Sequence, residues 1–198
     1  MSVYLSGSES CWDSTHCVGT PHCPPRCPRF VDAEGRPALV RPYVPTDRDS
    51  LVSMYATFDP AHRAQGLPPR TEAGIESWLD PLLADGEHVV AAVDGRIVGH
   101  CFYTPPSHPE PEMAVFVHSD FQNRGFGTEL CKHVIALADA NDREALVLDV
   151  ERCNRPAVRL YRNLGFETVE AHGRELHMRM VLSGPIVAAV RLPPAVRA

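Results

Sequence analysis

Residues 122–128 read Gln-Asn-Arg-Gly-Phe-Gly-Thr, and the architecture can be worked out from this stretch. An apolar run, Met113–Val117, precedes it, and a segment with helical periodicity, Gly127–Ala140, follows it. Two glycines in such a turn let the backbone approach a ligand closely, and the start of the next helix offers unpaired N–H groups and a positive dipole. The stretch therefore predicts a strand, a phosphate-binding loop and a helix. It lacks the Gly-Lys-Ser/Thr of a Walker A loop and the third glycine of a dinucleotide fingerprint.

A second motif runs from Asn154 to Phe166. Asn154 is a natural helix N-cap, Pro156 lies in the first turn, and Gly165 ends the predicted helix. Tyr161 follows Asn154 by about two helical turns, so both side chains can face the same side. Taken alone, this pattern also fits a capped amphipathic helix in which Tyr161 is a core aromatic residue.

Elements of both types alternate around the two motifs. We predict strands at 38–43, 87–93, 96–103, 113–118, 145–150, 168–171 and 175–182, and helices at 47–58, 71–84, 127–140 and 156–164. Asp94-Gly95 is a strong signal for a two-residue hairpin, and Pro81 is expected to kink the second helix or to end it early. The order predicts one mixed α/β domain around a sheet with antiparallel hairpins.

The two ends of the chain differ from the predicted domain, 38–182. Residues 1–37 are rich in Ser, Cys, His and Pro without apolar periodicity, so we expect a flexible tail that can be removed without loss of folding. Four cysteines lie in this tail, at positions 11, 17, 23 and 27, but they form no Cys-x-x-Cys pair, so no metal site is expected. Residues 183–198 are expected to be a second tail, in which 186–190 could pair as an edge strand.

Composition limits the classes of function. The chain has 198 residues, 44% of them hydrophobic, and a formal net charge of −6, which argues against a general nucleic-acid binder. No apolar run approaches the roughly 18–20 residues that span a bilayer, and the first thirty residues resemble no secretory signal. We expect a cytoplasmic protein without a nucleic-acid or membrane partner.

The patterns Gln-x-x-Gly-x-Gly and Asn-x-x-Ala-x-x-Leu-Tyr-x-x-x-Gly-Phe together resemble the GNAT superfamily of N-acetyltransferases, over about residues 39–182. The resemblance implies a largely antiparallel sheet splayed between its fourth and fifth strands, with about four helices. It implies acetyl transfer from acetyl-CoA to a primary amine by direct attack. A small-molecule amine is the first choice, and a protein N-terminus or lysine is the alternative. A non-catalytic acetyl-CoA sensor is an alternative of another class. Family members often dimerise, which leaves a homodimer open.

The resemblance also assigns roles to residues. Cofactor binding falls to Val115, Phe116, Val117, Gln122, Asn123, Arg124, Gly125, Phe126, Gly127, Thr128 and Asn154. The strand residues would pair with the pantetheine arm, and the glycine loop would hold the pyrophosphate. Arg124 is the expected source of positive charge, because coenzyme A is strongly anionic. Tyr161 would be the general acid for the leaving thiolate.

Asp149, directly or through ordered water, is the expected general base, and Glu112 is the rival candidate. Asp149 is a lone acid inside the apolar strand 145–150. Glu112 begins the fourth strand but is offset by one residue from the position that some family members use, which would turn it to the other side. The acceptor site is expected between the loop 59–70 and the final hairpin.

Overall fold

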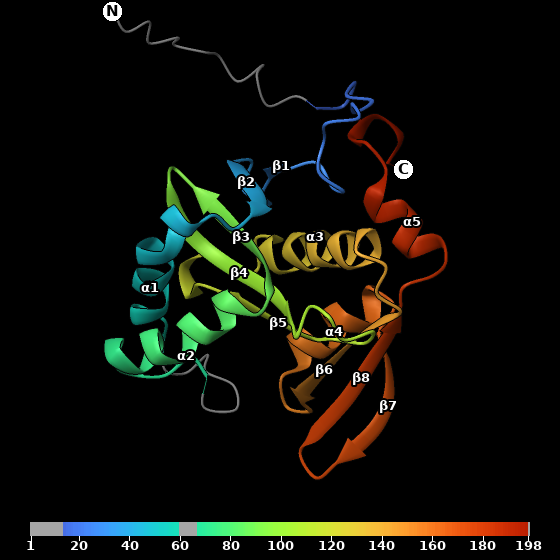
Figure 1. Ribbon diagram of the computed structural model, residues 1–198. Coiled ribbons are helices and arrows are strands. Elements are labelled where there is room, and N and C mark those ends of the chain that lie inside the picture. The colour runs from blue at the N-terminus through green and yellow to red at the C-terminus, as the bar shows by residue number, and fades with distance from the viewer. Residues whose placement is uncertain (1–13, 60–66, 198) are drawn as a thin grey trace, which may run out of the picture.

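The computed structural model describes residues 14–59 and 67–197 (Figure 1). These residues form one open eight-stranded sheet in the order β1-β2-β3-β4-β5-β6-β8-β7, and only β5 and β6 pair in parallel. The strands are β1 (Arg29–Val31), β2 (Pro37–Pro42), β3 (Glu87–Val93), β4 (Arg96–Thr104), β5 (Glu112–Val117), β6 (Ala145–Glu151), β7 (Glu167–His172) and β8 (Glu175–Val181). The helices are α1 (Arg48–Ala56), α2 (Glu72–Ala84), α3 (Phe126–Ala140), α4 (Arg155–Asn163) and α5 (Pro185–Arg191), with short 3-10 turns η2 (Pro45–Asp47), η4 (Ser119–Phe121) and η5 (Pro194–Val196).

Helices cover both faces of the sheet (Figure 1). On one face, Leu51 of α1 and Leu79 of α2 pack against Val90 of β3 in a separate apolar cluster. On the other face, α3 and α4 lie over β4, β5 and β6 in the larger core. This arrangement confirms the predicted mixed α/β fold and its largely antiparallel sheet.

Local sequence signals explain most element boundaries. The Thr71 hydroxyl accepts the Gly74 N–H at 3.1 Å and begins α2, which continues past Pro81 to Ala84 rather than ending early. Asp94 and Gly95 both have positive φ, as the predicted two-residue turn between β3 and β4 requires.

The sheet opens between β5 and β6. β5 pairs with β4 along its whole length, but it meets β6 only where Glu112 lies opposite Val147. β6 in turn pairs with β8 along its whole length. β5 and β6 correspond to the fourth and fifth predicted strands, so the predicted splay is present. Within the described residues, one edge of β5 has no neighbouring strand for most of its length.

A chain of buried hydrogen bonds ties the α1–α2 layer to the sheet. The Tyr55 hydroxyl bonds to His100 at 2.6 Å, His100 bonds to His88 at 3.0 Å, and His88 bonds to the Leu82 carbonyl at 2.7 Å. Burial lowers the pKa of both histidines, and a positive charge on His88 would lower that of His100 further, so burial favours the neutral form of both rings.

The N-terminal segment is more ordered than the sequence suggests. Residues 1–13 lie outside the described residues, but β1 pairs with β2, and the buried Arg26 bonds to Glu129 of α3. The predicted flexible tail is therefore wrong for residues 26–37. A three-residue strand shows no readable period, and an ion pair between positions 26 and 129 leaves no local signal.

The C-terminal segment also differs from its prediction. Residues 185–191 form α5 instead of an edge strand, and Val187 and Val190 are buried in the larger core beside α3. The Ala195 N–H donates to the Cys17 carbonyl at 3.0 Å, so the two ends of the described chain lie side by side. Among the described residues, no helix is long and apolar enough to cross a membrane.

Candidate active site

The glycine loop turns sharply between η4 and the start of α3. Asn123 has φ 59° and Gly125 has φ 92°, which is the left-handed region that favours glycine. In the described part of the chain, the backbone N–H groups of residues 123–128 donate to no acceptor, because α3 makes its first internal bond from Glu129 to Gly125. Six donors and the positive end of a helix dipole are therefore available for an anion.

A cleft of about 730 Å³ lies beside this loop. β5, the loop and the start of α4 form its walls, with Val115, Phe116, Val117, Gln122, Asn123, Gly125, Gly127, Thr128, Asn154, Pro156, Ala157 and Leu160 among the lining residues. Asn154 also caps α4, because its side-chain oxygen accepts the Ala157 N–H at 3.3 Å. The structure thus brings all the predicted cofactor residues together except the side chains of Arg124 and Phe126.

The open edge of β5 carries polar backbone groups into the gap. The His118 N–H donates back to Val98 of β4 at 2.9 Å. Because successive amides alternate in direction along a strand, those of Val117 and Val115 point toward the gap. The Gln122 side chain donates to the Val117 carbonyl at 3.2 Å. An extended chain with amide groups would find both donors and acceptors along this edge.

Arg124 does not supply charge to the cleft. Its guanidinium is buried, bonds to Asp32 and lies over the Phe121 ring at 4.7 Å. Phe126 is likewise a core residue, 1% exposed. Sequence reasoning missed the Arg124 pairing because Asp32 lies in the segment that was expected to be a tail.

Other cations lie next to the cleft. A second hollow of about 580 Å³ is lined by Asn123, Thr128, Lys132, Arg155, Pro156, Arg159, Leu160, Asn163 and Leu164. Arg155, Arg159 and Arg162 are exposed on α4, and within the described ranges none of them forms an ion pair with an acid. Their spacing at positions i, i+4 and i+7 of one helix was a sequence signal for a cationic face. This face carries positive charge on a protein whose net charge is negative.

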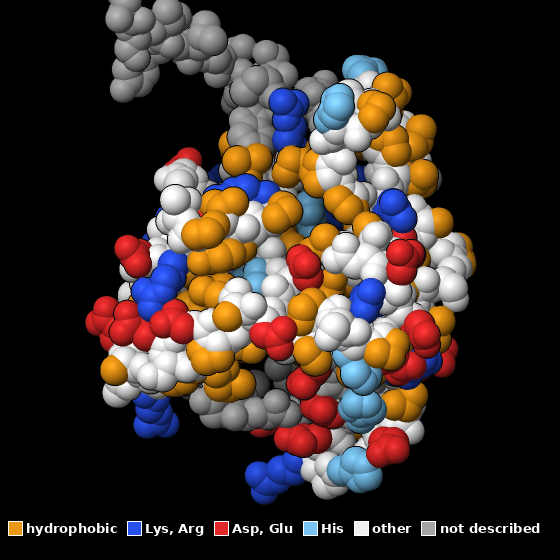
Figure 2. Space-filling view, in the orientation of Figure 1, with side chains coloured by type: hydrophobic (Ala, Val, Ile, Leu, Met, Phe, Trp, Pro, Cys, Tyr) orange, Lys and Arg blue, Asp and Glu red, His pale blue; other side chains and the backbone are white. Residues whose placement is uncertain are grey.

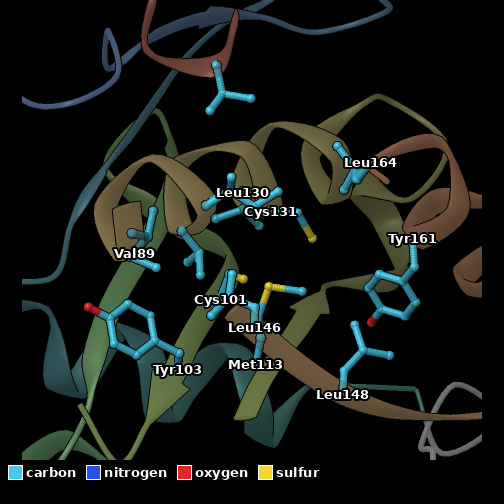
Figure 3. Packing of buried hydrophobic residues seen from close by; sticks show 14 of the residues in the cluster. Val89, Cys101, Tyr103, Met113, Leu130, Cys131, Leu146, Leu148, Tyr161 and Leu164 are labelled. Atoms are coloured by element: carbon cyan, nitrogen blue, oxygen red, sulfur yellow. The ribbon is translucent and has the colours of Figure 1, made fainter. Parts of the chain in front are cut away.

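Tyr161 lies in the core on the same side of the sheet as α3 and α4. It projects from α4 toward Leu148 of β6 (Figure 3) and is 7% exposed, with its ring 5.7 Å from that of Phe166. Burial raises the pKa of the Tyr161 hydroxyl well above its ordinary value. Tyr161 is therefore protonated at neutral pH, as a proton donor must be.

Asp149 and Glu112 lie on the opposite face from Tyr161. Asp149 alternates with the buried Leu148 along β6, and its carboxylate meets Nδ1 of His177 on β8 at 3.0 Å. Burial raises the pKa of Glu112, and the charge of Asp149 raises it further. Glu112 lies on the same face of the sheet as Asp149, because it alternates along β5 with Met113 of the larger core. Figure 2 shows acidic and histidine side chains gathered over β6, β7 and β8.

The remaining candidates have structural positions or lie outside the described residues. His118 is buried, bonds to the Thr57 hydroxyl at 3.2 Å and accepts the Asp120 N–H at 3.3 Å, which gives it a structural position at the end of β5. His62 and Arg63 of the predicted acceptor loop lie outside the described residues. His177 was not singled out from the sequence, because only the β6–β8 register places it opposite Asp149.

The splayed strands, the N–H-rich loop and the adjoining cleft define an α/β protein with a site that an extended, phosphorylated ligand could occupy. The chain belongs to the Acetyltransferase (GNAT) family, whose sequence profile matches residues 51–166.

Individual relatives agree with this membership. The chain is 33% identical over 144 residues to the mycothiol acetyltransferase of Saccharomonospora viridis, a match that covers 66% of this chain and 46% of that protein. The GNAT domain of S. lividans PAT superposes with a TM-score of 0.66 at 20% identity, over 77% of this chain and 95% of that one. A phosphinothricin acetyltransferase from Sinorhizobium meliloti, solved in complex with AcCoA, gives a TM-score of 0.60 at 18% identity, over 74% and 89% of the two chains. The chain thus spans less than half the length of the curated relative.

Proposed function

We propose that this chain transfers an acetyl group from acetyl-CoA to the primary amine of a small molecule. The observation that carries the proposal is the set of unbonded amides at residues 123–128, which border the 730 Å³ cleft. The S. meliloti structure holds AcCoA on a similar fold, which supports the same ligand here. The name of the S. viridis relative, a mycothiol acetyltransferase, favours a small-molecule acceptor.

The residues of the cleft fit the parts of acetyl-CoA. The amides of residues 123–128 would bind the diphosphate, and the open edge of β5 at Val115 and Val117 would pair with the pantetheine amides. Lys132, Arg155 and Arg159 would bind the remaining phosphate of the nucleotide. Acetyl-CoA would supply the thioester at the gap between β5 and β6.

In this proposal the proton donor and the proton acceptor come from opposite faces of the sheet. The amine nitrogen attacks the thioester carbonyl, a C–N bond forms and the C–S bond breaks. Tyr161, on the face covered by α3 and α4, gives its proton to the leaving thiolate. Glu112, on the other face, takes the proton of the amine, directly or through water, because its raised pKa makes it a stronger base than an ordinary glutamate. The negative charge of Asp149, which is paired with His177, contributes to the raised pKa of Glu112.

The test of this proposal is thiol release from acetyl-CoA with a panel of acceptors. The panel pairs small amines, such as amino acids, diamines and amino sugars, with peptides that carry a free N-terminus or a lysine. Acceptor-dependent thiol release with a small amine supports the proposal, and release with peptides alone would favour a protein acceptor. Acetyl-CoA binding without turnover on any acceptor would favour a sensor.

A further inference from the structure

A segment that takes no part in the proposed reaction packs against the glycine loop. Residues 26–36, which we call the N-terminal brace, contain β1 and the turn that leads into β2. Within the described residues, none of the brace lines the cleft. Three separate contacts nevertheless join it to the loop and to the first turn of α3.

The first contact is an ion pair in which the two oxygens of Asp32 have different partners. Oδ1 accepts the backbone N–H groups of Glu34 and Arg36, both at 2.9 Å, and so shapes the turn of the brace. Oδ2 accepts Nε of Arg124 at 2.9 Å and a second bond from Nη2. The Arg124 side chain of the glycine loop is thus hydrogen-bonded to Oδ2 of Asp32, and Oε2 of Glu34, also in the brace, lies 3.5 Å from its Nε.

The second contact is made by the loop backbone. The Ala33 N–H donates to the Arg124 carbonyl at 3.1 Å. The Phe30 ring stands edge-on to Phe126, with 5.3 Å between centroids, and a Cβ added to Gly125 would come within 3.2 Å of it. These contacts fix the loop at Arg124 and at Gly125, which is one of the two loop residues with positive φ.

The third contact balances charge below the loop. Glu129, in the first turn of α3, is buried and would repel a diphosphate bound at the helix N-terminus. Arg26 bonds to both Glu129 oxygens, at 2.7 and 2.9 Å, and to the Val190 carbonyl of α5 at 2.7 Å. The brace therefore neutralises the carboxylate that lies closest to the anion site along α3.

We propose that the N-terminal brace is a positioning element of the cofactor site, with Asp32 acting through Arg124 to hold the amides of residues 123–128 in their binding arrangement. Asn123 holds a positive φ, which is costly for a residue other than glycine, so an unbraced loop would spend less time in this conformation. Affinity for a ligand falls in proportion to the population of the competent state. This inference rests on the proposed use of coenzyme A.

Asp32→Asn is the variant that separates positioning from folding. The asparagine keeps an oxygen for the turn and replaces Oδ2 with an NH₂ group, which cannot accept from Arg124. Asp47→Asn is the matched control, because the Asp47 carboxylate is also buried, accepts two Arg41 bonds at 2.6 and 2.8 Å and accepts the Val44 N–H at 3.0 Å. Asp47 precedes α1, away from the loop. Calorimetry with free CoA and steady-state kinetics are measured well below the melting temperature of each variant.

We expect Asp32→Asn to weaken CoA binding about tenfold and to raise KM for acetyl-CoA similarly, with kcat at saturation changed less than about twofold. Asp47→Asn should lower the melting temperature without changing CoA affinity. Arg124→Gln combined with Asp32→Asn should be no weaker than the single variants, because both break one link. Equal CoA affinity in wild type and Asp32→Asn, or an equal loss in Asp47→Asn, would overturn the inference. A wild-type chain that binds no CoA would overturn the proposed function and this inference together.

Discussion

Tyr161 and Asp149 lie on opposite faces of the sheet, and neither lines the cleft as described. Tyr161 packs in the core with Leu148, whereas Asp149 is exposed on the face it shares with Glu112. In the proposed mechanism, the splay between β5 and β6 would let groups on both faces act on one reacting centre. A proton donor and a proton acceptor separated in this way would not neutralise each other before the substrates bind.

Replacing Tyr161 with Phe tests the proton donor. The ring keeps its place against Phe166, and only the hydroxyl is lost. We expect kcat to fall by roughly 10²–10⁴-fold, the usual share of general acid catalysis, while CoA affinity stays within about twofold. Thiol release and calorimetry measure the two quantities. An unchanged kcat would exclude Tyr161 as the acid.

The pH profile distinguishes the two carboxylates. The base must be ionised, so kcat/KM should fall as pH drops through the raised pKa of Glu112. Glu112→Gln should abolish this acid-side fall in kcat/KM together with most of the activity. Asp149→Asn removes a neighbouring negative charge, so the pKa of Glu112 should fall and the decrease in kcat/KM should move to lower pH. An active Glu112→Gln variant beside an inactive Asp149→Asn variant would assign the base to Asp149.

Helix α4 combines an N-cap residue that lines the cleft with a cationic face. Asn154 begins the helix and lines the cleft, and Arg155 and Arg159 line the adjoining hollow with Lys132. The helix thus connects the pantetheine part of the proposed ligand to its nucleotide part.

Charge reversal on α4 tests this connection. Arg159→Glu should weaken CoA binding by about tenfold or more, and the loss should be larger for CoA than for dephospho-CoA, which lacks the 3′-phosphate. Higher salt should narrow the difference between wild type and variant. Calorimetry with both ligands at two salt concentrations measures these effects. Equal losses for the two ligands would show that Arg159 does not contact the 3′-phosphate.

The elements that the sequence predicts are those with local signals. The Asp94-Gly95 hairpin, the capped helix α4 and the glycine loop before α3 each depend on residues that are close in the chain. β1 and α5 were missed because their stability comes from distant partners, such as Arg26 with Glu129. The role of Arg124 was mistaken for the same reason, since its partner Asp32 lies 92 residues earlier.

At the scale of the whole molecule, both ends of the described chain pack against α3. Arg26 bonds to Glu129 of α3 and to the Val190 carbonyl of α5. The segment that the sequence predicts to be a removable tail therefore supplies one partner of a buried ion pair. Burial would raise the pKa of Glu129, but the contacts with His133 and Arg26 lower it to about 2, so its charge persists at neutral pH.

Truncation tests this dependence. Removing residues 1–36 leaves Glu129 buried and charged without Arg26, which should destabilise the fold by about 3–5 kcal/mol. A shorter truncation that ends before Arg26 keeps the pair and is the control. Thermal unfolding of the three forms should show a large fall in melting temperature for the longer truncation only. An unchanged melting temperature after removal of residues 1–36 would restore the view of a dispensable tail.

The most direct measurement is calorimetric titration of the chain with CoA, in wild type and in Gly127→Glu. Gly127 suits the test because an added Cβ would meet only Leu160 and Val117 at ordinary distances, whereas Gly125 has positive φ and lies against Phe30. Both neighbours of Gly127 line the cleft, so a glutamate there places bulk and negative charge at the diphosphate site. Ala189→Glu on the exposed side of α5 is the charge-matched control. We expect micromolar binding in wild type and control and a loss of affinity of about 100-fold or more in Gly127→Glu. No binding to wild type, or equal binding by Gly127→Glu, would contradict it.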